Sequence, residues 1–310
     1  MSGTALGGCI YQVIDEYEQH LETELGTWDA AWGPFRFVSG ERKETFWNRN
    51  VWLEPFKLEF DSISDAAKAL RAIQRNWAPS LFTQFRRAEL IRSKLPPISS
   101  KSRSFPWIPP EAAMGAWTLL DEHTLLASAR CESPFPGGII DFEEDKEGPP
   151  SRAYLKLQEA LSRARSFPKA GERCLDAGAC PGGWTWVLAN LGAEVIAVDR
   201  SPIDERLSAL PNVEFRKHDA FTLKPEDIGP IDWLFSDVIC YPPRLYEWIE
   251  RWLVSGLCKN FICTIKMQGE GDVETTRRFA AIPGSSVVHL HYNKHELTWI
   301  KLANTDNTDN

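Results

Sequence analysis

The 310-residue sequence predicts an α/β protein in which a smaller α+β region precedes a doubly wound domain. Three observations support this prediction. From Ser151 onward, strand-like and helix-like segments alternate at regular spacing, which is typical of a parallel sheet with helices on both faces. The strand-like segment Arg173–Asp176 runs directly into a glycine-rich turn, and a helix follows near Thr185. Acidic residues also stand at the ends of several predicted strands.

Residues 1–110 mix strand-like and helical patterns, which predicts an α+β domain. The apolar runs Phe35–Val38 and Val51–Phe60 are typical of strands. Apolar residues at helical spacing then predict a helix over Ser64–Asn76, and a second, shorter helix is expected over Phe82–Lys94.

Residues 111–150 predict a hairpin followed by a connector. The runs Trp117–Leu120 and Thr124–Ala129 flank a short polar turn, as hairpin strands do. The stretch that follows is rich in Pro and Gly, which indicates a connection to a domain over residues 151–303. The polar segment 304–310 is expected to be a disordered tail.

The charge is distributed unevenly along the chain. The formal net charge of −8 counts, taken alone, against a nucleic-acid partner. Between Ser64 and Ser104, however, nine basic residues stand against Asp65 and Glu89, a balance of +7. A local basic patch matters more for phosphate binding than the total, although a solvated helix face with a basic loop explains the charge equally well. The basic residues are Lys68, Arg71, Arg75, Arg86, Arg87, Arg92, Lys94, Lys101 and Arg103.

The seven cysteines are scattered, and none forms a C-x-x-C pair. This argues against a disulfide framework and against a zinc site, and it favours a reducing, cytoplasmic location. The N-terminus lacks a basic segment followed by an apolar run, so no signal peptide is expected. No stretch of about eighteen apolar residues occurs, so we expect no membrane span. We therefore predict neither a metal nor a membrane partner, and the oligomeric state stays open.

The turn after the first strand of the C-terminal domain has the features of a nucleotide-binding site. It reads A-G-A-C-P-G-G-W from Ala177 to Trp184 and leads into a helix. Glycine lets the backbone approach a ligand closely, and the free N–H groups at a helix start bind a carboxylate or phosphate. The next strand, Glu194–Asp199, ends in an acid that can accept hydrogen bonds from ribose hydroxyls. This pattern fits either NAD or S-adenosyl-L-methionine (SAM), because both carry an adenosine ribose.

Two details favour SAM. The turn lacks the G-x-G-x-x-G pattern, and further acids, Asp219 and Asp237, end the third and fourth predicted strands. Open α/β sheets bind ligands at the carboxyl ends of their strands, so these acids should converge with Asp176 and Asp199. A cluster of carboxylates suits a ligand with a sulfonium and an ammonium, and it suits a pyrophosphate poorly. Any one of these acids, taken alone, is explained as well by a helix cap or a loop position.

Two lysines and a glutamate complete the candidate site. Lys266 ends an apolar strand, and Glu296 begins the second strand of a terminal hairpin over residues 286–302. Lys156 lies on a helix that opens at Ser151. A lysine at the end of a buried strand needs a pocket or a partner. Lys156, taken alone, is better explained as a solvated helical lysine.

In their order and spacing, these motifs resemble the FtsJ-like ribose 2′-O-methyltransferase family. They are S-R-A-Y-L-K-L, L-D-A-G-A-C-P-G-G-W-T, S-D-V, T-I-K and E-L-T, and the resemblance covers residues of about 130–303. It implies a Rossmann-like, class I SAM-dependent methyltransferase sheet that has helices on both faces and an antiparallel terminal hairpin. The family's catalytic tetrad falls on Lys156, Asp237, Lys266 and Glu296. Its SAM-binding positions fall on Asp176, Gly178, Pro181, Gly182, Gly183, Trp184, Asp199, Asp219 and Asp237.

Within the family, the stretches S-P-F-P-G-G and E-D-K-E-G-P-P-S-R-A-Y-L-K-L resemble most the bacterial enzymes that methylate a cytidine ribose of 23S rRNA. The resemblance therefore implies an RNA partner, either large-subunit rRNA or a precursor particle. Such enzymes carry an N-terminal RNA-binding THUMP domain, and we expect residues 1–110 to hold a reduced version of it. Tyr241 and Arg244 are expected either to hold the RNA or to form a rigid loop with the two prolines between them.

The resemblance assigns Lys266 as the general base that takes the proton of a ribose 2′-hydroxyl. An ordinary lysine has a pKa of about 10.4, so its pKa must fall for this role. We expect Lys156 and the SAM sulfonium to lower it, because like charges disfavour one another. Asp237 is expected to orient Lys266 and to face the sulfonium, and Glu296 to orient the lysines or the ribose.

Other functions stay open from the sequence. The methyl acceptor could be another rRNA site, a tRNA, an RNA cap or a protein. An NAD-dependent oxidoreductase with an unusual turn is a weaker alternative. A non-catalytic RNA-binding protein that keeps the fold is a third, although such a module has no need of two lysines beside two acids.

Overall fold

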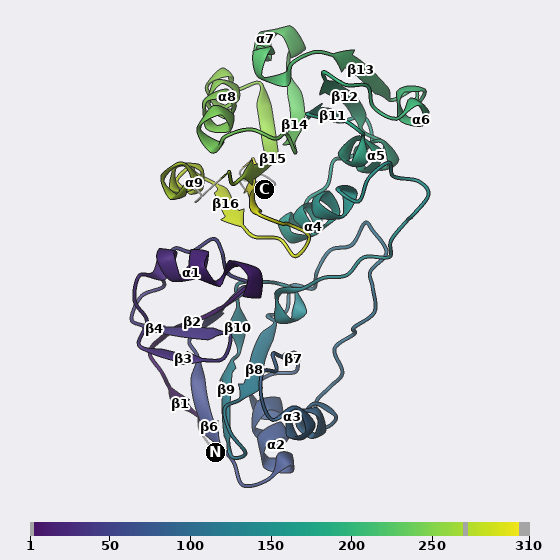
Figure 1. Cartoon of the computed structure of the whole chain (residues 1–310). Helices are drawn as coiled ribbons and strands as arrows, with labels where there is room; N and C mark the ends of the chain where they lie inside the picture. The colour runs from purple at the N-terminus through teal and green to yellow at the C-terminus, as the bar shows by residue number, and fades with distance from the viewer. Residues whose placement is uncertain (1–2, 269–271, 304–310) are drawn as a thin grey trace, which may run out of the picture. The chain divides into compact units, whose positions relative to one another are not determined.

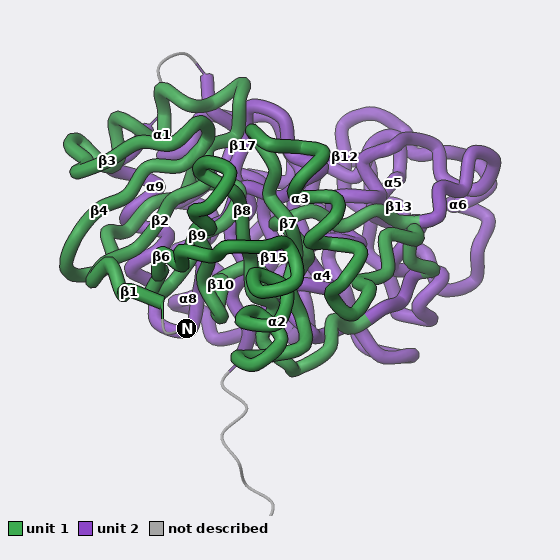
Figure 2. Tube along the Cα trace, turned by 90° about the horizontal axis from the view of Figure 1, so that it is seen from below, with its two compact units in different colours: residues 1–104, 108–142 green, residues 105–107, 143–310 purple. Residues whose placement is uncertain are grey.

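A computed structural model describes residues 3–268 and 272–303 of the chain (Figure 1). The chain divides into two compact units, coloured separately in Figure 2. The first unit contains residues 1–104 and 108–142, and the second contains residues 105–107 and 143–310. The tail predicted over residues 304–310 lies outside the described residues.

The first unit is built on two five-stranded sheets. The strand order of one sheet is β1 (Thr4–Ala5), β6 (Phe56–Glu59), β9 (Thr124–Ser128), β8 (Gly115–Leu119) and β7 (Trp77–Pro79). The order of the other is β10 (Arg130–Cys131), β5 (Asn50–Leu53), β2 (Gly8–Gln12), β4 (Phe35–Ser39) and β3 (Ala30–Trp32). The helices are α1 (Glu18–Leu25), α2 (Ile63–Ile73) and α3 (Phe85–Arg92), with short 3₁₀ turns at η1 (Asp15–Tyr17) and η2 (Pro136–Gly138).

Strand β9 shows how this unit is layered. Successive side chains of a strand point to opposite faces of its sheet. Leu125 and Ala127 belong to the same buried cluster as Leu70 of α2 and Ile91 of α3. Leu126, between them, belongs instead to the cluster that includes residues of the other sheet. The β6–β9–β8 sheet is therefore covered by helices α2 and α3 on one face and by the second sheet on the other.

The structure differs here from the sequence prediction. The hairpin expected within residues 111–150 forms as β8 and β9, but it is not part of a connector. It pairs with β6 and with β7 and so forms the centre of the first unit's sheet. The first unit consequently extends to residue 142 instead of residue 110. The sequence alone favours a separate hairpin because the partner strands lie tens of residues upstream.

The predicted helices form at α2 and α3, each shorter than expected. The single strand predicted over Val51–Phe60 is broken into β5 and β6. Glu54, between them, has a left-handed φ of 52°, and the next residue is Pro55, which has no N–H to donate to a sheet ladder. Strand β2 and helix α1 were not predicted.

The second unit contains one seven-stranded sheet. Its order is β13 (Val213–Lys217), β12 (Glu194–Asp199), β11 (Arg173–Ala177), β14 (Ile231–Ser236), β15 (Cys258–Lys266), β17 (Glu296–Lys301) and β16 (Ser285–Val288). The first five strands are parallel, and β17 runs antiparallel to both β15 and β16. This confirms the predicted Rossmann-like sheet and its antiparallel terminal hairpin.

Helices cover both faces of this sheet. From β11 the chain steps outward to β12 through α5 (Gly183–Asn190), whereas from β14 it steps in the opposite direction to β15 through α8 (Pro242–Ser255). Because parallel crossovers are right-handed, these two helices lie on opposite faces. Helix α4 (Tyr154–Ala164) packs with α5, and α9 (Val273–Ala280) packs with α8 (Figure 1). Short segments at α6 (Glu205–Ser208), α7 (Pro225–Ile228) and η3 (Ala220–Thr222) complete the crossovers.

This topology brings distant residues to one edge of the sheet. The parallel strands β11, β12, β14 and β15 all end there, and the antiparallel strand β17 begins there. Lys266, the last residue of β15, lies directly opposite Glu296, the first residue of β17. The chemistry of the second unit is therefore expected at this carboxyl edge.

Candidate active site

Four ionisable side chains meet at the carboxyl edge of the second unit's sheet. Lys156 Nζ lies 2.7 Å from Asp237 Oδ2 and 2.9 Å from Glu296 Oε1. Lys266 Nζ lies 2.5 Å from Asp237 Oδ1 and also donates to Glu296 Oε2. Each lysine thus contacts both acids, and the four groups form a closed ring of alternating charge. We call this set of residues the tetrad.

Three strands and one helix position the tetrad. Asp237 follows the last residue of β14, which runs parallel to β15. Lys266 and Glu296 are paired across the β15–β17 ladder. Lys156 lies in the first turn of α4. Neighbours in the ring are 29, 30 and 81 positions apart in the sequence, and Lys156 and Glu296 are 140 positions apart. Only the sheet topology brings them together.

The tetrad is largely withdrawn from solvent. The exposed fractions of the side chains are 12% for Lys156, 17% for Asp237, 15% for Lys266 and 8% for Glu296. Charges are costly to bury unless they are paired, and two positive charges here balance two negative ones. The small remaining exposure leaves the ring within reach of a ligand at this edge.

Thr264 is a further member of the site that the sequence analysis did not select. Its hydroxyl donates to Asp237 Oδ1 at 2.7 Å. Thr264 and Lys266 are two residues apart on β15 and therefore face the same side of the sheet. The signal was present in the T-I-K motif, in which the threonine precedes the lysine by one strand period.

The pKa shifts in the ring follow from its pairing. Burial by itself would raise the pKa of Asp237, but the adjacent ammonium groups of Lys266 and Lys156 hold it below its ordinary value. Burial would likewise lower the pKa of Lys266, but the carboxylates of Asp237 and Glu296 outweigh burial and raise it. The expectation of a lowered pKa for Lys266 is therefore wrong for the tetrad by itself. The sequence argument weighed Lys156 and a cationic ligand above the opposing effect of Asp237, and it did not include Glu296 as a second carboxylate in direct contact.

The glycine-rich turn packs tightly beside the tetrad. Gly178 has a φ of 80°, and a Cβ atom there would lie 2.8 Å from Cβ of Val238, the residue after Asp237. A Cβ atom on Gly183 would lie 2.5 Å from Ser151 Oγ. Gly182 has a φ of 115°, which side chains rarely adopt. Glycine at these positions lets the turn approach both the end of β14 and the segment that leads into α4.

Asp199, the last residue of β12, and Asp219, in the loop after β13, stand at the same edge. Asp199 accepts hydrogen bonds from the backbone N–H groups of Cys180, at 3.1 Å, and Ser201, at 2.8 Å. Asp219 accepts from Phe221 N at 3.0 Å and lies 3.9 Å from the guanidinium of Arg244. A carboxylate has about four acceptor sites, so these bonds leave capacity for a ligand's hydroxyl or amino groups.

Two predicted cofactor residues face the protein interior instead. Asp176 is 1% exposed, and its Oδ2 accepts from Thr185 Oγ1 at 2.6 Å. Burial is the main cause that raises the pKa of Asp176 to about 7. Trp184 is 3% exposed, and its Nε1 donates to Ala153 O at 2.9 Å. The hydrogen bond of Asp176 therefore joins β11 to the first turn of α5. The hydrogen bond of Trp184 joins the start of α5 to the residue before α4.

The remaining residues predicted from the sequence to take part in the site are Pro181, Tyr241 and Arg244. Pro181 is exposed at the tip of the glycine-rich turn, and its backbone oxygen accepts from Asp204 N at 3.0 Å. Tyr241 is 64% exposed and precedes α8, which begins at Pro242. Arg244 lies in the first turn of α8 with its guanidinium over the ring of Phe221. The Y-P-P-R segment is thus the start of a helix, and the alternative of a rigid loop is wrong.

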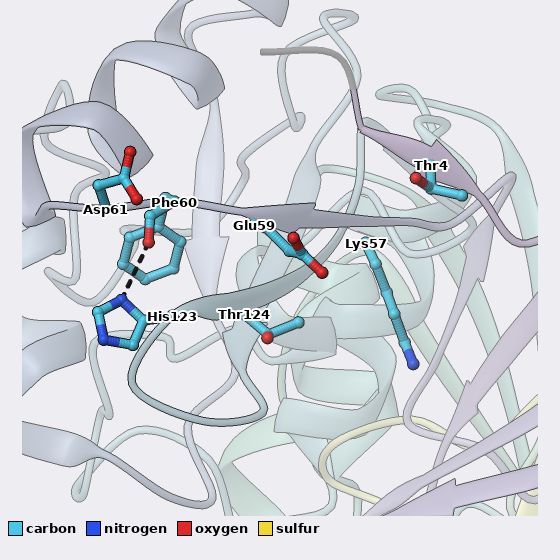
Figure 3. A pocket seen from close by; sticks show the side chains of 7 residues that line it. All are labelled: Thr4, Lys57, Glu59, Phe60, Asp61, His123 and Thr124. Atoms are coloured by element: carbon cyan, nitrogen blue, oxygen red, sulfur yellow. Dashed lines mark hydrogen bonds between the residues drawn. The ribbon is translucent and has the colours of Figure 1, made fainter.

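The first unit has a cavity of about 840 Å³ (Figure 3). It is lined by Thr4, Lys57, Glu59, Phe60, Asp61, His123 and Thr124. In Figure 3 the ring of His123 is turned toward the backbone oxygen of Phe60, at 3.1 Å. The lining side chains other than Phe60 are exposed or half-buried. These lining residues form no buried set of acids and bases comparable to the tetrad.

Neither a metal cluster nor a membrane-spanning helix is found in the described part of the chain. Within residues 3–268 and 272–303, no group of three His, Cys, Asp or Glu side chains is placed to hold a metal ion. Over the same ranges, the helices are too short or too polar to cross a bilayer.

Comparison with known families identifies the second unit. Residues 149–276 match the profile of the FtsJ-like methyltransferase family. These residues form an FtsJ-like methyltransferase domain. The matched segment begins just before α4 and contains Lys156, Asp237 and Lys266 of the tetrad, together with the glycine-rich turn. Glu296 lies beyond the matched residues, on the terminal hairpin.

Proteins similar to this chain include two named ribosomal RNA large subunit methyltransferase M. The protein from Azoarcus sp. is 32% identical over 185 residues, which cover 54% of this chain and 50% of the relative. The protein from Xanthomonas axonopodis pv. citri is 32% identical over 222 residues, which cover 69% of this chain and 60% of the relative. The match thus spans between half and three fifths of these relatives' length, in agreement with the resemblance found in the motifs.

A solved structure, the fibrillarin pre-rRNA processing protein of Methanococcus jannaschii, is 18% identical. It covers 48% of this chain and 75% of its own chain with a TM-score of 0.36, which is too low to carry an argument about the FtsJ-like domain.

Proposed function

We propose that this chain transfers a methyl group from S-adenosyl-L-methionine to the 2′-hydroxyl of a ribose in RNA, with a cytidine of large-subunit (23S) rRNA as the acceptor. The observation that carries the proposal is the ring of Lys156, Asp237, Lys266 and Glu296 at the carboxyl edge of the methyltransferase sheet. A partly exposed set of two amines and two carboxylates can hold a hydroxyl and move its proton.

The residues at this edge fit the proposed cofactor. S-adenosyl-L-methionine supplies an electrophilic methyl group on a positively charged sulfonium. The close-packed turn of Gly178, Gly182 and Gly183 would offer backbone groups, since the first N–H groups of α5 have no partner within the helix. Asp199 would accept from the cofactor's ribose hydroxyls and Asp219 from its adenine amino group. The negative charge of Asp237 suits a cationic ligand.

Lys266 is the proposed general base. Its ammonium must lose a proton before the amine can accept one from a ribose hydroxyl, and the raised pKa of Lys266 opposes that loss. Another positive charge brought to this edge favours the neutral amine, because like charges disfavour one another. Asp237 and Glu296 hold the two lysines in place, so the reacting groups are aligned before the reaction begins.

The RNA is proposed to contact the first unit as well as the tetrad. Helices α2 and α3 and the segment after them carry seven exposed basic residues, among them Arg71 and Arg86, which would suit the RNA backbone. This agrees with a reduced THUMP-like module in the first unit. Tyr241 is well placed to stack on an unpaired base, because it is exposed only four residues from Asp237.

The names of the relatives support large-subunit rRNA over other RNAs, although the match spans only part of each relative. We propose free rRNA or a precursor particle as the substrate, which would place the protein in the cytoplasm.

The test is direct mapping of ribose methylation. The purified chain is incubated with isotopically labelled SAM and with 23S rRNA, 16S rRNA, tRNA or capped RNA, and the product nucleosides are identified by mass spectrometry. We expect 2′-O-methylcytidine in 23S rRNA alone. Labelling of tRNA, of a cap or of a base instead of a ribose would contradict the proposed acceptor. No transfer to any of these RNAs or to a precursor particle of the large subunit, with SAM bound in a calorimeter, would contradict the proposed reaction.

A further inference from the structure

A buried carboxylate links the helix of Lys156 to the hairpin of Glu296. Glu159 lies one turn after Lys156 on α4 and is 1% exposed. Its Oε1 accepts from the backbone N–H of His291 at 2.8 Å, and its Oε2 accepts from the N–H of Tyr292 at 3.0 Å. Both donors lie in the segment between β16 and β17, which leads directly to Glu296.

The buried carboxylate of Glu159 needs hydrogen-bond partners, because a charge is costly to bury. Removing a carboxylate from water is tolerated where its oxygens are satisfied, and two successive backbone N–H groups here satisfy both oxygens of Glu159. A fold that needed only to fill this space could use an apolar side chain. The carboxylate instead ties α4 to two adjacent points of the hairpin segment.

The hairpin segment is attached to the strands as well. Met267 N donates to His295 O at 3.2 Å, which joins the segment to the end of β15. Asn293 Nδ2 donates to Thr298 Oγ1 at 3.0 Å, which joins it to β17. These bonds hold the segment to the sheet, whereas the bonds of Glu159 hold it to the helix that carries Lys156.

We propose that Glu159 is a positioning residue for the tetrad, which keeps Lys156 on α4 in register with Glu296 on β17. The catalytic consequence rests on the proposed function, but the geometric one does not. Lys156 Nζ and Glu296 Oε1 are 2.9 Å apart and belong to two different elements, α4 and β17. A displacement of about 1 Å would break this bond, and an error of that size in an active site can cost about 100-fold in rate.

The two segments that Glu159 joins carry several other ionisable residues. On α4 these are Lys156 and Arg163, and on the hairpin segment they are His289, His291, Lys294 and His295, with Glu296 after it. Substituting Glu159 also removes a negative charge from this group. A test must therefore separate the loss of position from the loss of charge.

The first variant is Glu159→Gln, which keeps one acceptor oxygen and replaces the other with an amino group that cannot accept. We expect kcat for methyl transfer to fall by about 10- to 100-fold while the Kd for SAM stays within twofold. The pH–rate limb should move to higher pH, opposite to Glu296→Gln, because Lys156 leaves the ring while Glu296 stays paired with Lys266 across the β15–β17 ladder. The double variant Glu159→Gln/Glu296→Gln should be no slower than the slower single variant, within about twofold, because both changes disrupt one interaction. Glu250→Gln, an exposed glutamate on α8, is the matched control and should behave like the unmodified protein.

The second variant is Glu159→Asp, which keeps the charge and both acceptors but shortens the reach by about one carbon–carbon bond, roughly 1.5 Å. A smaller shift in the same direction is expected, and it cannot come from lost charge. If Glu159→Gln does not yield folded protein, Glu159→Asp decides the question.

A titration that needs no RNA gives the independent measurement. The protein is labelled with ¹³C at the lysine side chains, Lys266 is assigned by its loss in Lys266→Arg, and its pKa is followed by NMR. We expect a higher pKa for Lys266 in the Glu159 variants, and a lower one in Glu296→Gln, than in Glu250→Gln. An unchanged Lys266 titration in both Glu159 variants, or fully additive rate losses, would overturn the positioning role. If the chain methylates no RNA, the proposed function fails, while this titration still decides the role of Glu159.

Discussion

Strand β15 carries a lysine near each end, and the two lysines differ sharply. Lys259, near the start, lies 2.7 Å from Asp232 at the start of β14. Lys266, at the end, lies 2.5 Å from Asp237, just after the end of β14. The same pair of residue types on the same two strands thus occurs at both edges of one sheet. The side chain of Lys259 is 67% exposed, whereas that of Lys266 is 15% exposed.

The difference lies in the partners and in the solvent. The hydrogen bond with Asp232 raises the pKa of Lys259, and water screens that pair. Lys266 is buried, which would lower its pKa, yet Asp237 and Glu296 together raise it. The ion pair at the amino edge is therefore an exposed surface pair. In the buried ring at the carboxyl edge, by contrast, the protonation of each amine and carboxylate depends on the others. The antiparallel strand β17 makes this difference, because it brings Glu296 to the carboxyl edge alone.

The largest expected effect comes from removing Lys266, and removal of Lys259 is the matched comparison. Lys266→Ala should lower kcat for RNA methylation by about 10²- to 10⁴-fold, the range for loss of a general base, and should leave SAM binding in place. Lys259→Ala should change kcat by less than about twofold, because solvent already screens its pair. Rates are measured by transfer of labelled methyl groups to rRNA, and SAM affinity by calorimetry. Near-normal turnover in Lys266→Ala would refute the assignment of the base.

A smaller effect is expected on the shape of the pH–rate profile. Because the pKa of Lys266 is raised in the resting site, the neutral amine becomes more abundant as pH rises, and kcat should increase with pH across the neutral range. Glu296→Gln removes one of the two carboxylates that raise this pKa, so the limb should move to lower pH. Profiles between pH 6 and about 10 would test this. A limb that stays in place would mean that Glu296 does not act on Lys266 through its charge.

The smallest effect concerns stability and compares a buried acid with a paired one. Burial raises the pKa of Asp176 from 3.8 to about 7, so between these values the folded protein binds more protons than the unfolded chain. Stability at this site therefore falls as pH rises through that window. Asp176→Asn should raise the free energy of unfolding at pH 8 by on the order of 1–3 kcal/mol and have little effect near pH 4.

Asp232 provides the control with the opposite sign. The hydrogen bond from Lys259 lowers the pKa of Asp232, so its stabilising contribution is present above the unfolded value of 3.8 and is lost as pH falls through the folded value. Asp232→Asn should therefore lower stability slightly at pH 7 and make no difference in strong acid. Thermal melts from pH 3 to 8 measure both variants. A loss of stability at pH 8 in Asp176→Asn would show that its carboxylate is ionised and favourably bonded.

Much of the second unit was predictable because its signals are local. The apolar runs that become β11, β12, β14 and β15 read as buried strands, and the glycines of the turn after β11 mark the start of α5. The tetrad followed from motif resemblance, since nothing local distinguishes Lys156 from a solvated helical lysine. Glu159 was not predicted as a site residue for the same reason, because the two backbone N–H groups that donate to it lie more than 130 residues away.

The first unit was harder to predict because its partners are distant in sequence. Strands β8 and β9 read as an isolated hairpin, yet β6 and β7 pair with their outer edges. Their apolar side chains on both faces are explained only by the helices on one side and the second sheet on the other. The extent of the unit could not be inferred until those pairings were known.

The sequence by itself determined the order of strands and helices in the methyltransferase domain, the tight glycine turn and the identity of the four tetrad residues. Periodicity and backbone freedom are properties of short segments, so they can be read along the chain. Only the tertiary structure decided that Asp176 and Trp184 face inward, that the pKa of Lys266 is raised, and that Glu159 holds α4 to the hairpin. These depend on burial and on distances of a few ångströms between residues far apart in sequence, and no local pattern encodes either quantity.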